Sequence, residues 1–213
     1  MRNFIGWRFA VTAAAVALAF WQDRPATAEE DKAASVDAFL ELAPVLQHPR
    51  CVNCHPKGES PLIGDDGRAH LPRVVRGPDG HGQGLKCTVC HGPQNNPGTG
   101  APGAPNWHLA PASMGWEGLS VPEICAALTD PEMNGGKTPE QVAVHMAEDP
   151  LVAWAWDPGM RPGRRERSVP PVDLETFGAL ARAWAASGAH CPTDADLAAA
   201  AEVAEPEAPA EDG

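Results

Sequence analysis

The chain has 213 residues, a length that fits one domain of ordinary size. Its formal net charge of −12 at pH 7 argues against nucleic acid as a partner, because the phosphate backbone would be repelled. Its 23 prolines and 21 glycines predict many turns and little regular structure.

The amino terminus has the pattern of a secretory signal peptide. Arg2 and Arg8 form a basic segment ahead of an apolar run over residues 9–20, and residues 26–28 form an A-x-A cleavage site. The run is short for a membrane span, so cleavage is the prediction and an uncleaved anchor is the alternative. We expect residues 1–28 to be removed and the mature chain to be periplasmic and not embedded in a membrane.

The first predicted helix covers residues 35–46. Val36, Phe39, Ala43 and Leu46 recur at helical spacing. Pro44 should kink or end this helix, because proline has no N–H to donate. A few residues later the chain reaches a cysteine-rich motif.

This motif, C-x-x-C-H, occurs twice, at residues 51–55 and 87–91. In such a motif two thiols can bond to the vinyl groups of one haem, and the adjacent imidazole can bind its iron. The sequence therefore predicts two covalently attached haem c groups. The alternative is a zinc site built from the four cysteines. The predicted attachment residues are Cys51, Cys54, Cys87 and Cys90, and the predicted proximal iron ligands are His55 and His91.

Two long stretches rich in glycine and proline follow the two motifs. Residues 56–86 have no sustained period and are expected to form a loop wrapped over haem. Residues 92–118 form the second stretch and carry Trp107 and Trp116. These two rings are expected to pack against haem.

Three further helices have clear start signals. Ser120 opens one capping box and Thr138 opens another, each with Glu or Gln three residues later. Asp173 can cap a third helix, which Gly188 should stop. The last segment, residues 194–213, contains seven acids and no lysine or arginine, which predicts a disordered acidic tail.

The expected fold is mostly α-helical, a compact dihaem cytochrome c-like unit with long Gly/Pro-rich loops. The predicted organisation is a signal peptide at 1–28, one dihaem domain at 29–193 and the acidic tail at 194–213. One compact unit is preferred to two tandem domains, because the segment between the motifs is too short for a complete single-haem domain.

Two cysteines lie outside the motifs. Cys125 and Cys191 form an even remainder in a compartment that is expected to be oxidising, so one disulfide is predicted between them. Two unlinked buried thiols are the alternative.

Each iron also has a second axial position. His145 is the first candidate for it, since it falls on the apolar face of a capped helix, where a buried imidazole needs a partner. His70 is the second, on the loop expected to cross the first haem. Met114 is the main alternative, Met160 is a weaker one, and histidines that bind no metal are the competing interpretation. The remaining, weaker candidates are His48, His81 and His108.

The densest basic cluster of this acidic chain consists of Arg161, Arg164, Arg165 and Arg167. These side chains are suited to neutralising haem propionates or contacting an acidic partner. A plain solvated loop is an equal alternative.

From His48 to Pro192 the chain resembles the dihaem cytochrome c proteins known as cytochrome-type subunits of isoquinoline 1-oxidoreductase. The resemblance rests on residues 48–56, 76–77, 85–91, 107–111, 145–146, 151–159 and 188–192. It implies a periplasmic electron carrier that works beside a molybdenum hydroxylase. The substrate oxidation would then take place on that partner.

These features favour electron transfer, with no enzymatic activity of the chain's own. The expected partners are redox proteins: a molybdenum hydroxylase as donor and a cytochrome or oxidase as terminal acceptor. The alternative is a dihaem peroxidase-like enzyme, which needs one iron with an open position. A haem-based sensor is a third class, but no signalling domain is recognisable in the sequence.

Overall fold

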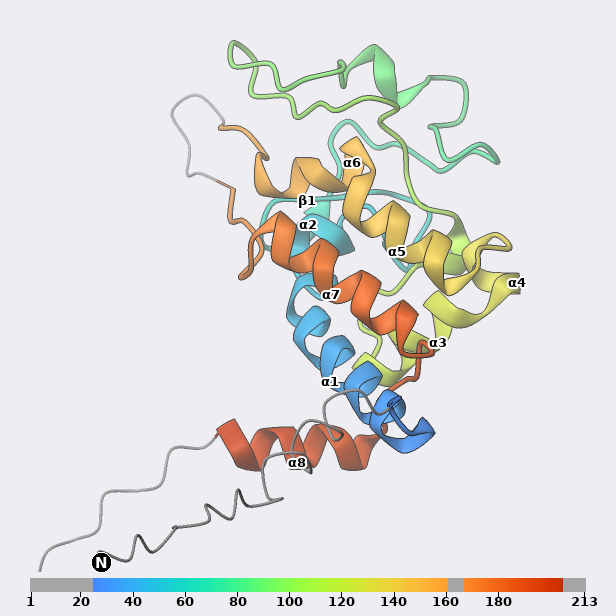
Figure 1. Ribbon diagram of the computed structural model, residues 1–213. Coiled ribbons are helices and arrows are strands. Elements are labelled where there is room, and N and C mark those ends of the chain that lie inside the picture. The colour runs from blue at the N-terminus through green and yellow to red at the C-terminus, as the bar shows by residue number, and fades with distance from the viewer. Residues whose placement is uncertain (1–24, 161–166, 205–213) are drawn as a thin grey trace, which may run out of the picture.

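The structure, a computed structural model, describes residues 25–160 and 167–204. Most of the predicted signal peptide lies outside these residues. The described chain is mostly helical (Figure 1), as the sequence predicts. No helix in these two ranges is long and apolar enough to cross a membrane.

Three helices form the main core. Helix α7 (Leu174–Ala186) packs against both α1 (Ala28–Leu46) and α5 (Pro139–Glu148). The rings of Phe39 and Trp184, both fully buried, meet with centroids 5.4 Å apart. Burying a large apolar side chain of this kind contributes about 1.5–3 kcal/mol.

The predicted helix starts at Ser120, Thr138 and Asp173 are confirmed. Helix α3 (Val121–Thr129) and helix α5 each begin with a complete capping box. Asp173 accepts a hydrogen bond from the Thr176 N–H at 2.8 Å at the start of α7. These caps satisfy backbone N–H groups that have no partner inside the helix.

Helix α1 is longer than the apolar spacing predicts. It begins at Ala28 with a capping box between Thr27 and Glu30, and the residues before Ser35 are exposed. Exposed residues carry no apolar stripe, so periodicity cannot reveal this first part. Pro44 lies within the last turn, and the helix ends two residues later at Leu46.

The prediction of disorder from residue 194 onward is wrong for residues 194–204. These form helix α8 (Asp194–Ala204), which lies at one end of the molecule (Figure 1). Thr193 and Asp196 exchange hydrogen bonds at its start, at 2.7 and 3.3 Å. An alanine-rich segment can form a helix through intrinsic helix propensity alone, without contacts to a core. The acidic residues of this segment predict disorder instead, so composition alone misses the helix. Residues 205–213 lie outside the described chain.

Several short helices and strands lie within the loops. The connection from α2 (Pro49–Val52) to α3 contains a two-stranded hairpin, and it gathers at the end of the molecule opposite α8 (Figure 1). The other short helices, α4 and α6, each start with an Asp cap followed by proline. The bounds of the short elements are β1 (Leu62–Ile63), β2 (Arg68–Ala69), η2 (Cys87–Val89), η3 (Ala112–Met114), α4 (Pro131–Asn134), α6 (Pro150–Ala153) and η4 (Trp154–Trp156).

A disulfide joins Cys125 on α3 to Cys191 after α7, the pair expected from the sequence. Their sulfurs are 2.03 Å apart and their Cα atoms 5.5 Å apart. Cys125 is fully buried within the core. The bridge therefore ties the chain after α7 to α3 through the centre of the helical layer.

Candidate haem centres

The first C-x-x-C-H motif lies on a helical turn that begins at His48. His48 Nδ1 accepts a hydrogen bond from the Arg50 N–H at 3.2 Å and caps α2. The His55 N–H donates to the Cys51 carbonyl at 3.1 Å, which continues the turn through the motif. Cys51, Cys54 and His55 therefore face the same side, as residues three and four apart on a helix do.

The second motif has the same local backbone. The N–H groups of Cys90 and His91 both donate to the Cys87 carbonyl, at 3.1 and 2.9 Å. Helix η2 forms this turn, and Cys90 is exposed while Cys87 is partly buried. Each motif thus presents two thiols and one imidazole from a single compact turn.

Both motif histidines have their Nδ1 atoms engaged by backbone carbonyls. His55 Nδ1 lies 2.7 Å from the Met114 carbonyl oxygen, and His91 Nδ1 lies 2.8 Å from that of Pro102. A carbonyl only accepts, so Nδ1 carries the proton and Nε2 keeps its lone pair. Metal-binding histidines are typically oriented in this way, by a hydrogen bond from the second ring nitrogen.

Burial keeps these imidazoles neutral. It lowers the pKa of His55 to about 3, against the opposing effect of the Met114 carbonyl. The pKa of His91 is also lowered, first by burial. A neutral imidazole is the form that binds a metal ion.

An indole ring stacks on each of the two imidazoles. Trp116 lies parallel to His55 with centroids 3.6 Å apart, and Trp107 lies parallel to His91 at 4.7 Å. The angles between the ring planes are 2° and 5°. The two centres therefore share a carbonyl acceptor and a stacked indole, although different loops supply them.

A cavity of about 510 Å³ adjoins the second motif. Cys87, Cys90 and His91 line it, and Cys54 of the first motif reaches it as well. Ligand cavities of roughly 300–1,000 Å³ hold molecules of cofactor size. Burial raises the pKa of Cys54 to about 11, and the neighbouring Cys87 adds to this rise. The two motifs are therefore close neighbours.

His70 lies beside the second motif. Its ring centroid is 5.9 Å from that of His91, and its Nδ1 is 2.8 Å from the Pro72 carbonyl oxygen. Two imidazoles that bind one metal ion at about 2 Å each have centroids roughly 6 Å apart. The structure thus brings the loop that carries His70 next to His91 of the second motif.

His145 is not buried as expected. Its neighbours Val142 and Met146 are buried, whereas the His145 side chain is 42% exposed. Its Nδ1 lies 3.0 Å from Asp149 Oδ2, which leaves Nε2 for another partner. The charge of His145 contributes to the lowered pKa of His55, so the two rings lie within electrostatic range of each other.

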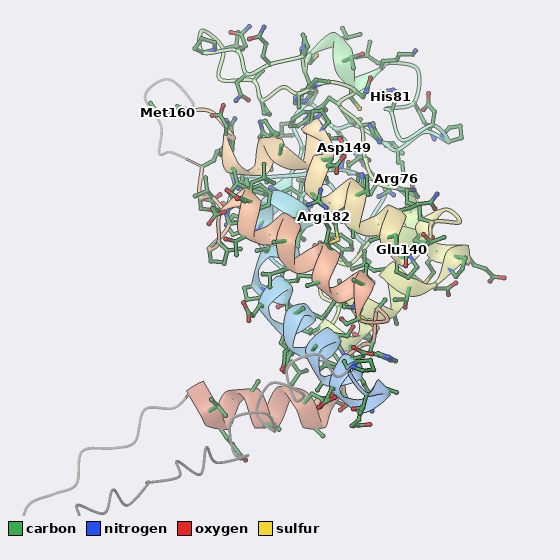
Figure 2. The ribbon with its side chains drawn as sticks, in the orientation of Figure 1. Arg76, His81, Glu140, Asp149, Met160 and Arg182 are labelled. Carbon is green, nitrogen blue, oxygen red and sulfur yellow. A yellow bond between two sulfur atoms is a disulfide. The ribbon has the colours of Figure 1, made fainter. Side chains whose placement is uncertain are left out.

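The two methionine candidates lie in unsuitable places. The Met114 backbone carbonyl accepts the hydrogen bond from His55 Nδ1, so Met114 lies on the Nδ1 side of that ring, away from Nε2. Its side chain is buried in the core. Met160 is 60% exposed, and in Figure 2 it lies on the opposite side of the molecule from His81. The geometry therefore favours neither residue as an axial ligand.

Four histidines remain. The rings of His81 and His108 lie 6.2 Å apart, and buried His81 Nδ1 has no hydrogen-bond partner. His48 caps α2, and His190 is exposed.

Two buried arginines hold the loops around the first motif. The Arg50 side chain is 1% exposed, donates to the Gly64 carbonyl at 3.1 Å and pairs with Asp65. The Arg76 side chain donates to the carbonyls of Ala110 at 2.7 Å and Gly58 at 3.1 Å. Both residues lie within the segments of the family resemblance, but the sequence predicts no structural role for either. The signal available was the position of Arg50, directly before Cys51.

Several buried donors in this region have no acceptor. They are Nε of Arg50, Nε1 of Trp116, the indole that stacks on His55, and Nε of Arg76, which faces the Glu59 carboxylate at 3.9 Å, beyond hydrogen-bond distance. An unsatisfied buried donor costs about 1–3 kcal/mol. Carboxylate groups such as haem propionates would satisfy these donors, so the residues around the motifs fit the group that the motifs predict.

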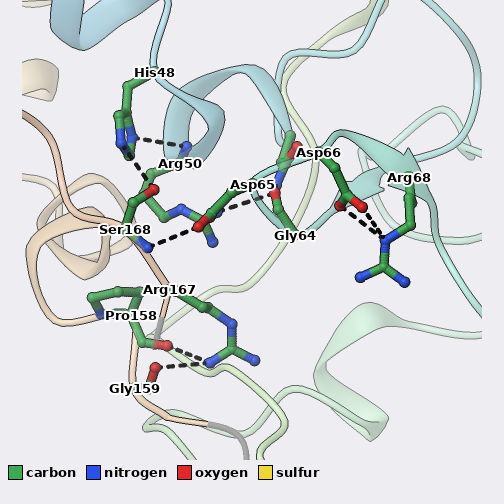
Figure 3. A network of polar contacts seen from close by, with 11 residues as sticks. His48, Arg50, Gly64, Asp65, Asp66, Arg68, Pro158, Gly159, Arg167 and Ser168 are labelled. Carbon is green, nitrogen blue, oxygen red and sulfur yellow. Dashed lines mark hydrogen bonds and ion pairs between the residues drawn. The ribbon is translucent and has the colours of Figure 1, made fainter. Parts of the chain in front are cut away.

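The predicted basic cluster is mostly outside the described residues, since Arg161, Arg164 and Arg165 fall in the undescribed segment. Arg167 is described, and it lines the 510 Å³ cavity. It donates to the carbonyl of Pro158 at 2.6 Å (Figure 3) and to that of Gly100 at 2.7 Å. Its role here is to join two loops at the cavity wall.

A Ser–His–Asp grouping near the first motif is structural (Figure 3). Ser168 Oγ lies 3.2 Å from His48 Nε2, and the Ser168 N–H donates to Asp65 at 3.2 Å. His48 Nδ1 accepts from the Arg50 N–H, so its proton sits on Nε2 and points to Ser168. A general base would need the opposite tautomer. The grouping therefore clips Ser168 to the start of α2.

The four-cysteine zinc alternative lacks its geometry. Within the described ranges, no three His, Cys, Asp or Glu side chains gather so as to hold a metal ion. A structural zinc site needs four ligands around one point.

No protein-family model, curated protein or solved structure matches this chain.

Proposed function

We propose that this chain is a periplasmic dihaem c-type cytochrome that transfers electrons. The observation that carries the proposal is the repetition of one arrangement at two places. Each C-x-x-C-H turn presents a neutral histidine whose Nδ1 donates to a carbonyl and whose ring stacks on an indole. Such orientation of a free Nε2 supports metal binding at both motifs.

In this proposal the cysteines attach the haems, the histidines bind the irons, and backbone carbonyls orient the histidines. Cys51 and Cys54 would hold one haem, and Cys87 and Cys90 the other, through thioether bonds. Bound haem supplies one-electron chemistry between Fe(III) and Fe(II). His55 and His91 would bind the irons through Nε2. The Met114 and Pro102 carbonyls fix the ring orientations.

A different histidine would provide the second iron ligand at each of the two centres. His70 is proposed for the haem of the second motif, because its ring lies 5.9 Å from that of His91. His145 is proposed for the first, held by Asp149 at 3.0 Å. If His70 and His145 both held an iron, neither iron would have an open position for peroxide, and the bound haems would supply electron transfer. A peroxidase-like enzyme is the alternative. The half-exposed His145 is the observation that favours it, since an imidazole with access to water can be displaced.

The resemblance described from the sequence adds a proposed setting. In it the chain is an electron acceptor for a molybdenum hydroxylase and passes electrons to a further cytochrome or oxidase.

The deciding experiment counts haems by mass. The protein is matured in a bacterial strain with a cytochrome c maturation system, and intact mass spectrometry should show two added haems. The double variant Cys87→Ala/Cys90→Ala should retain one haem. A wild-type protein without covalent haem would refute the proposal.

Carbon monoxide distinguishes the two functional classes. Reduced wild-type protein should leave its absorption spectrum unchanged under carbon monoxide if both irons are closed. Met114→Leu is a matched control and should behave like wild type, because its backbone carbonyl makes the contact to His55. Carbon monoxide binding by the wild type would favour the peroxidase-like alternative.

A further inference from the structure

The charge of this acidic protein is unevenly placed. Residues 67–116 contain four basic residues and one acid, whereas the whole chain has a net charge of −12. This segment makes up most of the loop end of the molecule, opposite α8 (Figure 1). The whole connection from α2 to α3, residues 53–120, has five basic and five acidic residues, so this end of the molecule has none of the acidic excess, and residues 67–116 are its basic part.

Large apolar side chains are exposed at the same end. Leu71 is 78% exposed, Val89 is 66% exposed and Leu85 is 56% exposed. Leu71 and Leu85 line the mouth of the 510 Å³ cavity together with Cys90. Exposed apolar side chains grouped around a cavity are typical of interaction sites.

Two of the cations flank this apolar group. Lys86 lines the cavity mouth between Leu85 and Cys87, and Arg73 follows Leu71 by two residues. Both are exposed, and no described residue pairs with either. The other two cations are engaged, since Arg68 pairs with Asp66 at 2.8 Å and Arg76 is buried.

The two motifs differ in their access to a partner. Cys90 and Val89 of the second motif are exposed and Cys87 is partly buried, while both cysteines of the first motif are partly buried. Electron transfer to another protein is favoured where a cofactor edge approaches the surface. The second motif offers that approach, and Cys54 connects it to the first.

We propose that the second-motif face, formed by Leu71, Arg73, Leu85, Lys86 and Val89, is the docking surface for a redox protein. That partner would present an apolar centre with an acidic rim. In each encounter one electron moves: the partner's centre is oxidised as one iron goes from Fe(III) to Fe(II), or the reverse, and no covalent bond forms or breaks. This inference rests on the proposed function. Weak electron-transfer complexes have small interfaces of this kind, steered by charge.

Small oxidising ions of opposite charge test where electrons leave the reduced protein. Stopped-flow absorbance follows oxidation of the reduced dihaem protein by ferricyanide, an anion, and by tris(phenanthroline)cobalt(III), a cation. If electrons leave through the second-motif face, the ferricyanide rate should fall as ionic strength rises, despite the net charge of −12. The cobalt complex should show the opposite dependence.

Charge-reversal variants locate the effect. Lys86→Glu or Arg73→Glu should slow ferricyanide about 10-fold at low ionic strength, because a trivalent anion loses a nearby attraction and meets a repulsion. Lys32→Glu makes the same charge change on α1, at the other end of the molecule, and should alter the rate less than twofold. Equal effects of Lys86→Glu and Lys32→Glu would overturn the assignment.

Two measurements probe docking itself. Hexacyanochromate(III), a paramagnetic ion that is not reduced here, should broaden the amide NMR signals of Leu85 and Lys86 before that of Lys32. With reduced flavodoxin as an acidic protein donor, Leu85→Ser should slow electron transfer by a larger factor than it slows ferricyanide, because a protein partner would cover this apolar side chain. Broadening confined to other faces, or no effect of Leu85→Ser on flavodoxin, would overturn the proposal.

Two other outcomes also count against it. A dimer in sedimentation velocity that Lys86→Glu dissociates would make this face a contact between two copies of the chain. A protein without covalent haem would refute the proposed function, and this inference with it, and the absorption spectrum shows that case before any kinetics. With two haems present, a rate of ferricyanide oxidation that rises with ionic strength refutes the docking face alone.

Discussion

Removing the Cys125–Cys191 disulfide should lower the free energy of unfolding by about 4 kcal/mol. The bridge closes a loop with a sequence separation of 66 residues. In the chain-entropy treatment, a loop of that length restricts the unfolded chain by about 4 kcal/mol at 25 °C. For a protein of this size, that corresponds to a fall in melting temperature of about 8–16 °C.

The assay is urea unfolding of Cys125→Ala/Cys191→Ala, followed by far-ultraviolet circular dichroism at equal haem content. Wild-type protein treated with a phosphine reductant is the matched control, because it loses the cross-link and keeps both sulfur atoms in the core. Both should lose a similar amount of stability. A loss below about 1 kcal/mol in the reduced wild type would refute the reasoning, since the loop would then contribute no constraint on the unfolded chain.

Three further predictions concern the candidate centres and the helices. His70→Ala and His145→Ala should each let one haem per molecule bind carbon monoxide in reduced protein; unchanged spectra in both would remove them as axial ligands. Arg76→Met removes a buried cation near His55 and should lower one reduction potential by tens of millivolts, on the order expected for one nearby charge, whereas Arg76→Lys should retain most of it in redox titration. Thr138→Ala removes the N-cap of α5 and should cost about 1 kcal/mol in urea unfolding, with no change in the haem spectra; a spectral change would mean that α5 is coupled to the first centre.

Local patterns predicted the helices that local physics controls. The caps at Ser120, Thr138 and Asp173 satisfy N–H groups within their own first turns, so a few adjacent residues are enough to identify them. The start of α1 and the whole of α8 escaped the apolar-spacing analysis, because their exposed residues follow helix propensity and capping rather than a buried stripe.

The position of His145 shows the limit of a helical-face argument. Val142 and Met146 are buried as their spacing predicts, and His145 shares their side of the helix. Nevertheless its side chain is 42% exposed, because α7 covers only part of that face. Spacing assigns a residue to a side of a helix, but the neighbouring elements decide how far that side is covered.

The sequence by itself determined the two C-x-x-C-H turns, the pairing candidates Cys125 and Cys191, and the capped helices, since each depends on residues close together or on elimination among few cysteines. Only the tertiary structure decided that His70 lies beside His91, that Cys54 reaches the cavity of the second motif, and that buried Arg50 and Arg76 hold the loops. The path of a Gly/Pro-rich loop cannot be predicted from hydrophobic periodicity, because such a loop has none. It is set by bonds between side chains and distant carbonyls, such as that from Arg76 to Ala110, which form only when the whole chain is folded.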